Sequence, residues 1–308
     1  MKDQRPKLII ITGPTASGKT GLAVEMALNF NGEIINADSM QVYRFMDIGT
    51  AKPPVSERKG VPHHMIDVVY PDGEFNASIY RTLTMPVINE ISKKRRACFV
   101  VGGTGLYIKA LLGGLMECPA SDHDIREELT DECKEKGPSF LHERLKRVDP
   151  ESADYIHPND KTRIIRALEI IRLTNRPRSS FIMEHGFNEN PFKTLKICLN
   201  ISRDQLYKNI NIRCDRMIES GLIDETQTLL AKGYSSDIRS MKSLGYRHAV
   251  SYLRKEQTAE DMALKFKQDT RRYAKRQLTW FRADREMIWV EPVNREFIKH
   301  KIQEFIDR

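Results

Sequence analysis

Residues 13–20 combine glycines, a lysine and a threonine at a spacing that predicts phosphate binding. Their sequence, Gly-Pro-Thr-Ala-Ser-Gly-Lys-Thr, fits the pattern G-x-x-x-x-G-K-[ST] between a strand-like run and a helix-like run. The glycines let backbone N–H groups surround phosphate oxygens, Lys19 supplies a cation, and the Thr20 hydroxyl is suited to Mg²⁺. We therefore predict a diphosphate site with Thr20 as a metal ligand, formed by Gly13, Pro14, Thr15, Ala16, Ser17, Gly18, Lys19 and Thr20.

Two further polar residues, Asp38 and Thr104, follow the ends of other strand-like runs. Ligands of open α/β sheets lie at the carboxyl edges of the strands, so Asp38 is placed to face the reactive end of a bound diphosphate. Its carboxylate could hold Mg²⁺ through water or accept a proton; the alternative is a loop-capping role. Thr104 lies among glycines that allow close approach of a ligand, or that simply connect a strand to a helix.

The surrounding elements predict an α/β core interrupted by helices. Strand-like and helix-like runs alternate in the first third of the chain, which favours a parallel sheet covered on both faces. From about Pro119 the chain becomes acidic, helix-rich and strand-poor. The expected strands are 7–12, 33–36, 65–69, 98–101, 194–201 and 287–290, and the expected helices are 21–30, 80–94, 125–136, 139–148 and 160–174. We predict a P-loop NTPase-like core from residues 1–115 and 195–308, with an all-helical insertion domain at 116–194 that contacts a polyanion.

Composition excludes several other classes of protein. The 308 residues are 40% hydrophobic and 30% charged, which excludes disorder and a coiled coil for the whole chain. No apolar run is long enough to span a membrane, and the charged first residues lead directly into a strand without a signal-peptide core. Five cysteines without a C-x-x-C pair predict neither a disulfide scaffold nor a structural zinc site, and they are typical of a cytoplasmic protein.

The net charge of +8 is concentrated in two short segments. Residues 265–285 hold eight basic residues against two acidic ones, and residues 161–178 hold six against Glu169 alone. One such run usually marks a solvated helix face, but two in a chain with a phosphate loop favour an extended anionic ligand. A kinase or another NTPase remains open at this point. Against it, no strand ends in an Asp suited to hold Mg²⁺ beside a second catalytic carboxylate.

Several segments, taken in their order along the sequence, resemble the bacterial tRNA dimethylallyltransferase family. They run from about residue 8 to residue 285, and the segment 270–282 is the most specific of them. They are Gly13–Thr20, Ala37–Tyr43, Asp47–Pro53, Val61–His64, Val101–Tyr107, His157–Asp160, Arg163–Glu169, Leu244–Arg247 and Thr270–Arg282. The chain departs from the family at Tyr207-Lys-Asn209-Ile210, where an arginine is common in place of Asn209.

The resemblance implies transfer of a dimethylallyl group from its diphosphate to the exocyclic N6 amine of an adenine. That adenine lies immediately 3′ of the anticodon in tRNAs that read codons beginning with U. The implied catalytic residues are Asp38 as general base, with Thr104 and Arg213 near the diphosphate, and Mg²⁺ as cofactor. The partners are the tRNA anticodon stem-loop and dimethylallyl diphosphate, with no membrane, and a cytoplasmic monomer is expected.

The resemblance also implies a set of RNA-facing residues from several segments. Within an expected helix over 263–281, Arg271, Lys275 and Arg282 share a face, and Trp280 is expected to pack in the core rather than stack on a base. The implied tRNA-binding residues are Asp38, Ser39, Met40, Gln41, Arg126, Arg163, Arg166, Lys242, Gly245, Tyr246, Arg247, Arg272, Lys275, Arg276, Gln277, Trp280 and Arg282.

Three alternatives remain beside this interpretation. A P-loop kinase of a small metabolite would use Asp38 as a base but has no need of segment 270–282. A prenyltransferase acting on free adenine nucleotides would lack the insertion and the basic segment. An RNA-binding protein with a degenerate phosphate loop would lack the reactive side chains, whereas Lys19, Thr20 and Asp38 are all present.

Overall fold

A computed structural model describes residues 5–116, 118–185 and 189–308 of the chain. The chain packs as two compact units, one formed by Met1–Leu112 with Asn190–Arg308 and the other by Gly113–Glu189. The insertion was expected to begin at residue 116 and end at residue 194. The second junction lies earlier because β5 (Lys193–Leu199) already belongs to the sheet. The Pro-, Asn- and Gly-rich composition of residues 186–191 also predicts that this stretch closes the insertion, and residues 186–188 of it lie outside the described residues.

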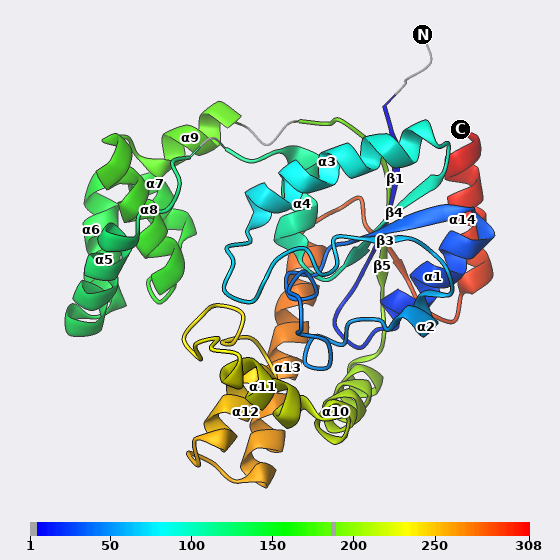
Figure 1. Ribbon diagram of the computed structural model, residues 1–308. Coiled ribbons are helices and arrows are strands. Elements are labelled where there is room, and N and C mark those ends of the chain that lie inside the picture. The colour runs from blue at the N-terminus through cyan, green and yellow to red at the C-terminus, as the bar shows by residue number, and fades with distance from the viewer. Residues whose placement is uncertain (1–4, 117, 186–188) are drawn as a thin grey trace. The chain divides into compact units, whose positions relative to one another are not determined.

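The larger unit is built on a six-stranded sheet with the order β3-β2-β4-β1-β5-β6, and every neighbouring pair is parallel (Figure 1). The strands are β1 (Lys7–Thr12), β2 (Gly32–Asn36), β3 (His63–His64), β4 (Ala97–Gly102), β5 and β6 (Ile288–Val290). The predicted α/β class with a parallel sheet is confirmed. The predicted strand at 65–69 is wrong, because the chain pairs with β2 only at His63 and His64.

Alternating side chains of the central strands separate two layers of core. Ile9 and Ile11 pack with residues of α1 (Lys19–Asn29) and α14 (Arg295–Asp307) in one cluster. Because successive side chains of a strand point to opposite faces, Leu8 and Ile10 face the other layer. There α3 (Ala77–Lys93) and α4 (Gly105–Gly113) cover the sheet (Figure 1). The sheet is thus buried on both faces, as a parallel sheet requires.

The remaining helices of this unit follow β5, apart from the short α2 (Val55–Arg58). They are α10 (Arg203–Glu219), α11 (Leu222–Ala231), α12 (Tyr246–Leu253) and α13 (Ala259–Arg282). Both α10 and α12 pack against α13. The α13 helix begins four residues before the expected start because the Thr258 hydroxyl accepts a hydrogen bond from Asp261 N–H, which caps the first turn.

The smaller unit is entirely helical in its described part. It contains α5 (His123–Lys136), α6 (Pro138–Val148), α7 (Pro150–Tyr155), α8 (Lys161–Thr174) and α9 (Arg178–His185). Aspartates cap three of these helices by accepting backbone N–H bonds, and leucines and isoleucines fill a separate core. Across the described ranges, none of the helices in either unit is both long and apolar enough to cross a bilayer.

Candidate active site

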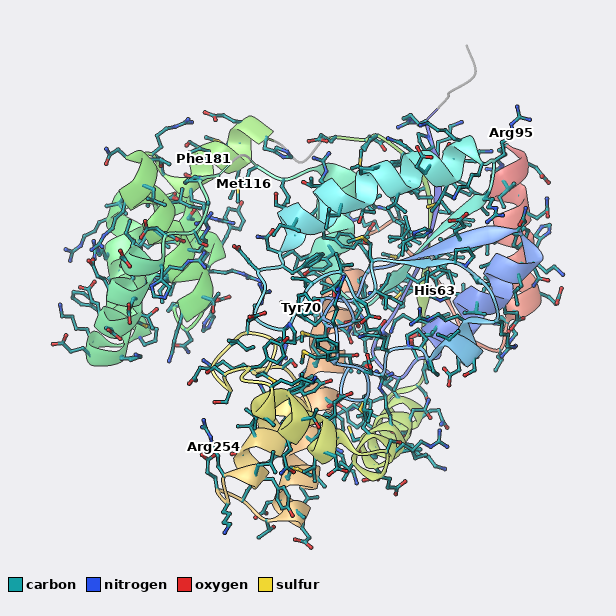
Figure 2. The ribbon with its side chains drawn as sticks, in the orientation of Figure 1. His63, Tyr70, Arg95, Met116, Phe181 and Arg254 are labelled. Atoms are coloured by element: carbon teal, nitrogen blue, oxygen red, sulfur yellow. The ribbon has the colours of Figure 1, made fainter. Side chains whose placement is uncertain are left out.

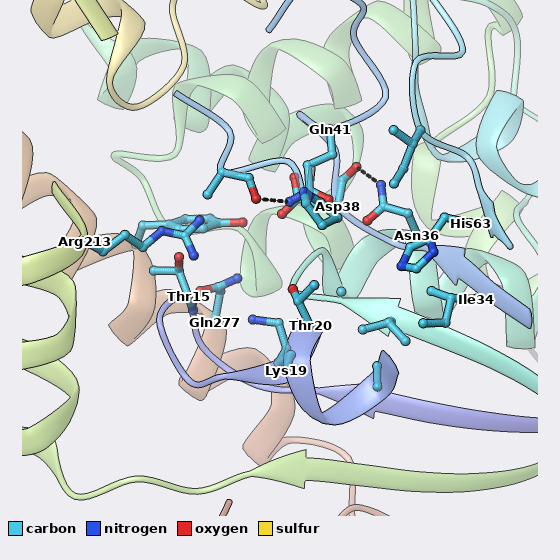
Figure 3. A pocket seen from close by; sticks show the side chains of 17 residues that line it. Thr15, Lys19, Thr20, Ile34, Asn36, Asp38, Gln41, His63, Arg213 and Gln277 are labelled. Carbon is cyan, nitrogen blue, oxygen red and sulfur yellow. Dashed lines mark hydrogen bonds between the residues drawn. The ribbon is translucent and has the colours of Figure 1, made fainter. Parts of the chain in front are cut away.

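One pocket gathers Asp38, Arg213 and the reactive side chains of the phosphate loop, whereas Thr104 does not line it but hydrogen-bonds Ser39, next to Asp38. The pocket lies at the carboxyl ends of β1, β2 and β4, which are neighbours in the sheet, and its empty volume is about 620 Å³ including the open space at its mouth. Figure 3 shows Arg213 and Thr15 at one side of the pocket, and His63 and Ile34 at the other. The lining residues are Thr15, Lys19, Thr20, Ala23, Ile34, Asn36, Asp38, Gln41, Ala51, Pro53, His63, Ile66, Val101, Gly102, Arg213, Tyr273 and Gln277.

The phosphate loop forms the floor of this pocket. Lys19 Nζ donates a 2.8 Å hydrogen bond to the Pro14 carbonyl, so the loop itself holds the ammonium group at the pocket. The loop is anchored from α13, since Thr15 N–H donates to Gln277 Oε1 at 2.8 Å and Gln277 Nε2 donates to the Gly103 carbonyl at 3.0 Å. Gln277 therefore links the phosphate loop to the loop that follows β4.

The electrostatics of the pocket suit an anionic ligand facing a carboxylate. Burial, and then the charge of Arg213, lowers the pKa of Lys19 to about 8, while Asp38 acts in the opposite direction. The pKa of Arg213 is also lowered, chiefly by burial, and again Asp38 opposes the shift. Two cations that are costly to bury thus share one site with one carboxylate. An added anion would relieve the mutual repulsion of the two cations.

Asp38 and Thr104 are brought together by a close approach of two backbones. A Cβ on Gly102 would lie 2.2 Å from the Ala37 carbonyl oxygen, so only glycine fits there. This contact lets Thr104 N–H donate to the Ala37 carbonyl, and Ser39 N–H donates to Thr104 Oγ1 at 3.0 Å. Met40 N–H donates to Asp38 Oδ1 at 2.9 Å and orients the carboxylate. Asp38 therefore combines the loop-capping role with a place in the pocket.

Three polar pocket residues, Asn36, His63 and Tyr273, were not nominated from the sequence. Asn36 ends β2 and donates to the Met65 carbonyl, and Tyr273 hydrogen-bonds Thr104. His63 bonds the Val61 carbonyl through Nδ1, whereas its buried Nε2 has no partner among the described residues. Tyr273 could have been found from its spacing, since it lies one helical turn before Gln277 on α13. His63 belongs to the segment Val61–His64, to which no role had been assigned.

The loop that supplies Ala51 and Pro53 to the pocket wall depends on Glu225 of α11. Its carboxylate accepts the N–H groups of Asp47 and Ile48 at 2.9 Å and of Gly49 at 3.2 Å. It also accepts the Tyr246 hydroxyl at 2.5 Å, and a Cβ on Gly49 would collide with the Tyr246 ring. These bonds fix the loop that carries pocket residues Ala51 and Pro53.

Glu225→Ala is expected to lower the free energy of unfolding by roughly 2–3 kcal/mol and to raise the KM for the diphosphate substrate severalfold, because three backbone donors lose a charged acceptor. Thermal unfolding and initial rates measure the two effects. Glu219→Ala, which removes an exposed carboxylate of α10, is the matched control. Unfolding and KM unchanged in Glu225→Ala would show that this carboxylate does not position the loop.

The structure leaves some of the predicted RNA-facing residues of the larger unit exposed and buries others. Exposed cations remain on α12 and α13 and in the loop before α12, namely Lys242, Arg247, Arg272, Lys275, Arg276 and Arg282. Asp269 accepts hydrogen bonds from both Arg247 and Arg272, which joins α12 to α13 on this side. Arg271 is only partly exposed and donates to Asn211 of α10 at 2.7 Å. It therefore does not share the exposed face expected for it.

The expectations for four residues need correction. Tyr246 is 0% exposed and its hydroxyl is bound to Glu225, and the adjoining Gly245 is also buried, so neither offers a surface to RNA. Gln277 is buried with its amide engaged at the phosphate loop, which makes it a pocket residue rather than an outer contact. Trp280 is 39% exposed and packs against Gly105, so the expectation that it lies in the core is wrong.

In the helical unit, a buried carboxylate orients two of the predicted RNA-facing arginines. Glu169 is fully buried and accepts Arg126 Nε at 2.9 Å, Arg166 Nη1 at 2.7 Å and Asp122 N–H at 2.7 Å. Arg166 also donates to the Pro119 carbonyl. Arg163 is exposed and lies 3.5 Å from Asp160. Glu169, the one acidic residue of the basic segment 161–178, thus orients Arg126 and Arg166.

Comparison with known proteins gives the family of the chain. A protein-family profile described as IPP transferase matches residues 41–284. A "tRNA dimethylallyltransferase 2" of Geotalea uraniireducens is 52% identical over 289 residues, which cover 94% of this chain and 93% of that protein. A "tRNA dimethylallyltransferase" of Desulfosudis oleivorans is 48% identical over 93% of this chain and 91% of its own length.

Solved structures similar to this chain come from the same kind of transferase. The full-length tRNA isopentenylpyrophosphate transferase of Bacillus halodurans is similar with a TM-score of 0.74 and 40% identity, covering 98% of this chain and 97% of that one. A eukaryotic dimethylallyltransferase acting on tRNA has a TM-score of 0.78 and 28% identity, covering 97% of this chain and 77% of that one. With the phosphate loop, Asp38 and Arg213 in one pocket and relatives along nearly its whole length, this chain belongs to the IPP transferase family.

Proposed function

We propose that the chain transfers a dimethylallyl group from dimethylallyl diphosphate to N6 of the adenine immediately 3′ of the anticodon, in tRNAs that read codons beginning with U. The observation that carries the proposal is Asp38 opposite a phosphate loop, with Lys19 and Arg213 in the same pocket. The relatives named tRNA dimethylallyltransferase supply the substrate class. We expect the protein to act as a monomer in the cytoplasm, where tRNA is available to it.

The reaction forms a bond between N6 of adenine and the allylic carbon, and it breaks the bond from that carbon to the diphosphate oxygen. Negative charge grows on the leaving diphosphate, where Lys19, Arg213 and loop N–H groups stabilise it. An arylamine is barely basic, so the proton must leave N6 as the C–N bond forms. The Asp38 carboxylate, oriented by Met40 N–H, is placed to receive it.

Magnesium fits this pocket as a cofactor shared with the substrate. Mg²⁺ usually takes one or two protein oxygens and completes its shell with phosphates and water. The described part of the chain has no cluster of three or more His, Cys, Asp or Glu side chains for a metal, whereas Thr20 and Asp38 both line the pocket. Thr20, and Asp38 through water, would hold the ion, which neutralises charge on the diphosphate when bound.

The exposed cations of α13 are proposed to bind the RNA backbone. The target adenine must leave the stacked anticodon loop to reach a pocket, and extrusion of a base needs a firm grip on the surrounding backbone. Arg272, Lys275, Arg276 and Arg282 are exposed on the helix that also supplies Tyr273 and Gln277 to the pocket. The same helix thus links RNA contacts to the reaction site. The oriented Arg126 and Arg166 of the helical unit are proposed to add contacts.

Incubation with Mg²⁺, labelled dimethylallyl diphosphate and unmodified tRNA tests the proposal. Label is expected on the adenine next to the anticodon, and chelation of Mg²⁺ should suppress the transfer. Transfer of phosphate from ATP to a small metabolite would instead support a kinase, and label on free adenosine monophosphate would support the nucleotide prenyltransferase. No label on tRNA would contradict the proposal.

Arg272→Ala combined with Arg276→Ala is expected to weaken tRNA binding with little change in kcat at saturating tRNA. Affinity for RNA falls with salt, and each lost phosphate contact makes the plot of log affinity against log salt less steep by about 0.7–0.9. The steepness of this plot should therefore decrease by about 1.5 when both arginines are removed. Filter binding at several salt concentrations measures it.

The matched control is Arg95→Ala with Lys299→Ala, which removes the same charge from exposed sites outside α13 (Figure 2 labels Arg95). The control should keep the wild-type salt slope. An unchanged slope in the Arg272 and Arg276 variant, or an equal loss in the control, would argue against phosphate contacts on α13.

A further inference from the structure

Two aromatic side chains lie together on the surface of the larger unit, outside the pocket. Phe45 is 45% exposed and Tyr70 is 49% exposed, and their ring centroids are 5.8 Å apart at an interplanar angle of 42°. Figure 2 labels Tyr70 near the middle of this unit. Neighbouring exposed aromatic rings are costly to leave in water, which makes the pair a candidate contact surface.

Two cations flank the rings. The Arg44 guanidinium lies 4.8 Å from the Tyr70 ring centroid and donates to the Tyr70 hydroxyl at 3.2 Å, and Lys232 Nζ lies 5.3 Å from the Phe45 centroid. Many exposed cations of this chain pair with carboxylates, but these two form no ion pair within the described residues. Arg44 Nε also donates to the Asp67 carbonyl, the nearby carboxylates of Asp67 and Asp47 share Lys52, and Asp72 near Tyr234 adds a negative charge. The surface therefore sets aromatic area beside two cations that have no carboxylate partner among the described residues.

The backbone holds Phe45 in this place at a cost. Its φ is +66°, a left-handed conformation that is unusual for a bulky residue. Hydrogen bonds on either side hold it, since Arg44 N–H donates to the Val69 carbonyl at 2.8 Å and Asp47 N–H donates to Glu225 Oε2 at 2.9 Å. The next residue, Met46, is fully buried. Backbone strain that the surroundings maintain is common at functional positions.

The same loop lines the pocket on both sides of Phe45. Gln41 precedes it, and Ala51 and Pro53 follow it. Gln41 Nε2 donates to the Thr50 and Ala51 carbonyls, which joins the two arms of the loop. Phe45 therefore belongs to the same loop as three residues that line the pocket.

We propose that Phe45 and Tyr70 stack on an unpaired base of the tRNA, in a nucleotide that flanks the reacting adenine. Arg44 and Lys232 would contact the phosphate of that nucleotide. Aromatic rings beside cations are the usual means of binding single-stranded nucleotides, because every base has a stacking face and every nucleotide carries a negative charge. This inference rests on the proposed tRNA substrate. It assigns a separate subsite for the nucleotide outside the pocket.

The experiment uses the full chain and an anticodon stem-loop RNA in which 2-aminopurine replaces one loop nucleotide at a time. Stacking by the wild type should quench one labelled position next to the target adenine. Phe45→Gly and Tyr70→Ala are each expected to abolish that quenching and to weaken RNA binding about tenfold or more. Phe45→Tyr, which keeps the ring, should retain both. Phe45→Gly should also keep or raise Tm, because glycine accepts a φ of +66°.

Phe297→Ala is the matched control. Phe297 is 46% exposed and Lys301 lies 5.7 Å from its ring, but it belongs to α14 and not to the pocket loop. This variant should bind RNA as the wild type does. Unchanged quenching and affinity in Phe45→Gly and Tyr70→Ala, measured in chains that still fold, would overturn the stacking site even if the wild type prenylates tRNA. Loss of dimethylallyl transfer by the wild type would instead overturn the proposed function.

Discussion

Asp38→Ala is expected to lower kcat by about 10²–10⁴-fold while tRNA binding is retained, because the variant lacks the group that accepts the N6 proton. Lys19 and Arg213 would remain, and the proposed Mg²⁺ would lose only its water-mediated contact to Asp38, so the affinity for dimethylallyl diphosphate should fall by much less than kcat. Single-turnover rates and filter binding measure the two properties separately. Equal loss of binding and turnover would indicate that Asp38 mainly positions RNA.

Asp38→Asn separates chemistry from loop structure. The amide oxygen can still accept the hydrogen bond from Met40 N–H, which is 2.9 Å from Asp38 Oδ1, but the amide cannot take up a proton as a carboxylate does. We expect Asn at this position to be as inactive as Ala and to unfold at the wild-type temperature. Activity near the wild-type level in Asp38→Asn would contradict the role of general base.

Lys19→Met is expected to lower kcat/KM by about 10²–10³-fold, the usual loss when one group that stabilises a developing anion is removed. Methionine preserves much of the aliphatic volume, so the phosphate loop should keep its fold. The leaving diphosphate would then face Arg213 and the loop N–H groups without the ammonium. Initial rates with dimethylallyl diphosphate measure the loss, and a decrease of less than threefold would contradict it.

The pH dependence of diphosphate binding distinguishes Lys19 from the other cation. Burial and the charge of Arg213 lower the pKa of Lys19 to about 8, so its positive charge is present below pH 8 and is lost above it. Affinity for the diphosphate should therefore be full below pH 8 and decline as the pH rises further. Comparison with Lys19→Met over the same range removes the ionisation of the ligand itself. Parallel profiles of the two proteins would contradict this assignment.

The site was predictable where chemistry depends on contiguous residues. The phosphate loop, Asp38 and Thr104 each follow a predicted strand, and the structure confirms all three of these strands as β1, β2 and β4. Arg213 was assigned through resemblance, and the structure places it in the pocket. The strand at 65–69 was wrong because hydrophobic pattern alone does not show where an edge strand loses its partner.

Helix faces were harder to assign. Periodicity places Gln277 and Trp280 on α13, but only packing shows that Gln277 turns into the pocket while Trp280 remains partly exposed. Tyr246 stands beside the exposed Arg247, and its burial follows from Glu225, which is 21 residues away in sequence. The surface at Phe45 and Tyr70 also joins residues from separate segments. Such contacts depend on which segments meet, and sequence periodicity carries no information about that.

Local sequence by itself specified the phosphate loop, the basic character of α13 and the presence of a helical unit inserted into an α/β unit. Each depends on residue types and spacing within a few turns of chain. The tertiary structure alone decided that β2, β4 and β1 are neighbours, so that Asp38, Thr104 and Lys19 meet at one edge. It also decided that Arg213 and Tyr273 join them from two helices, because long-range packing of the hydrophobic core selects the strand order and helix positions.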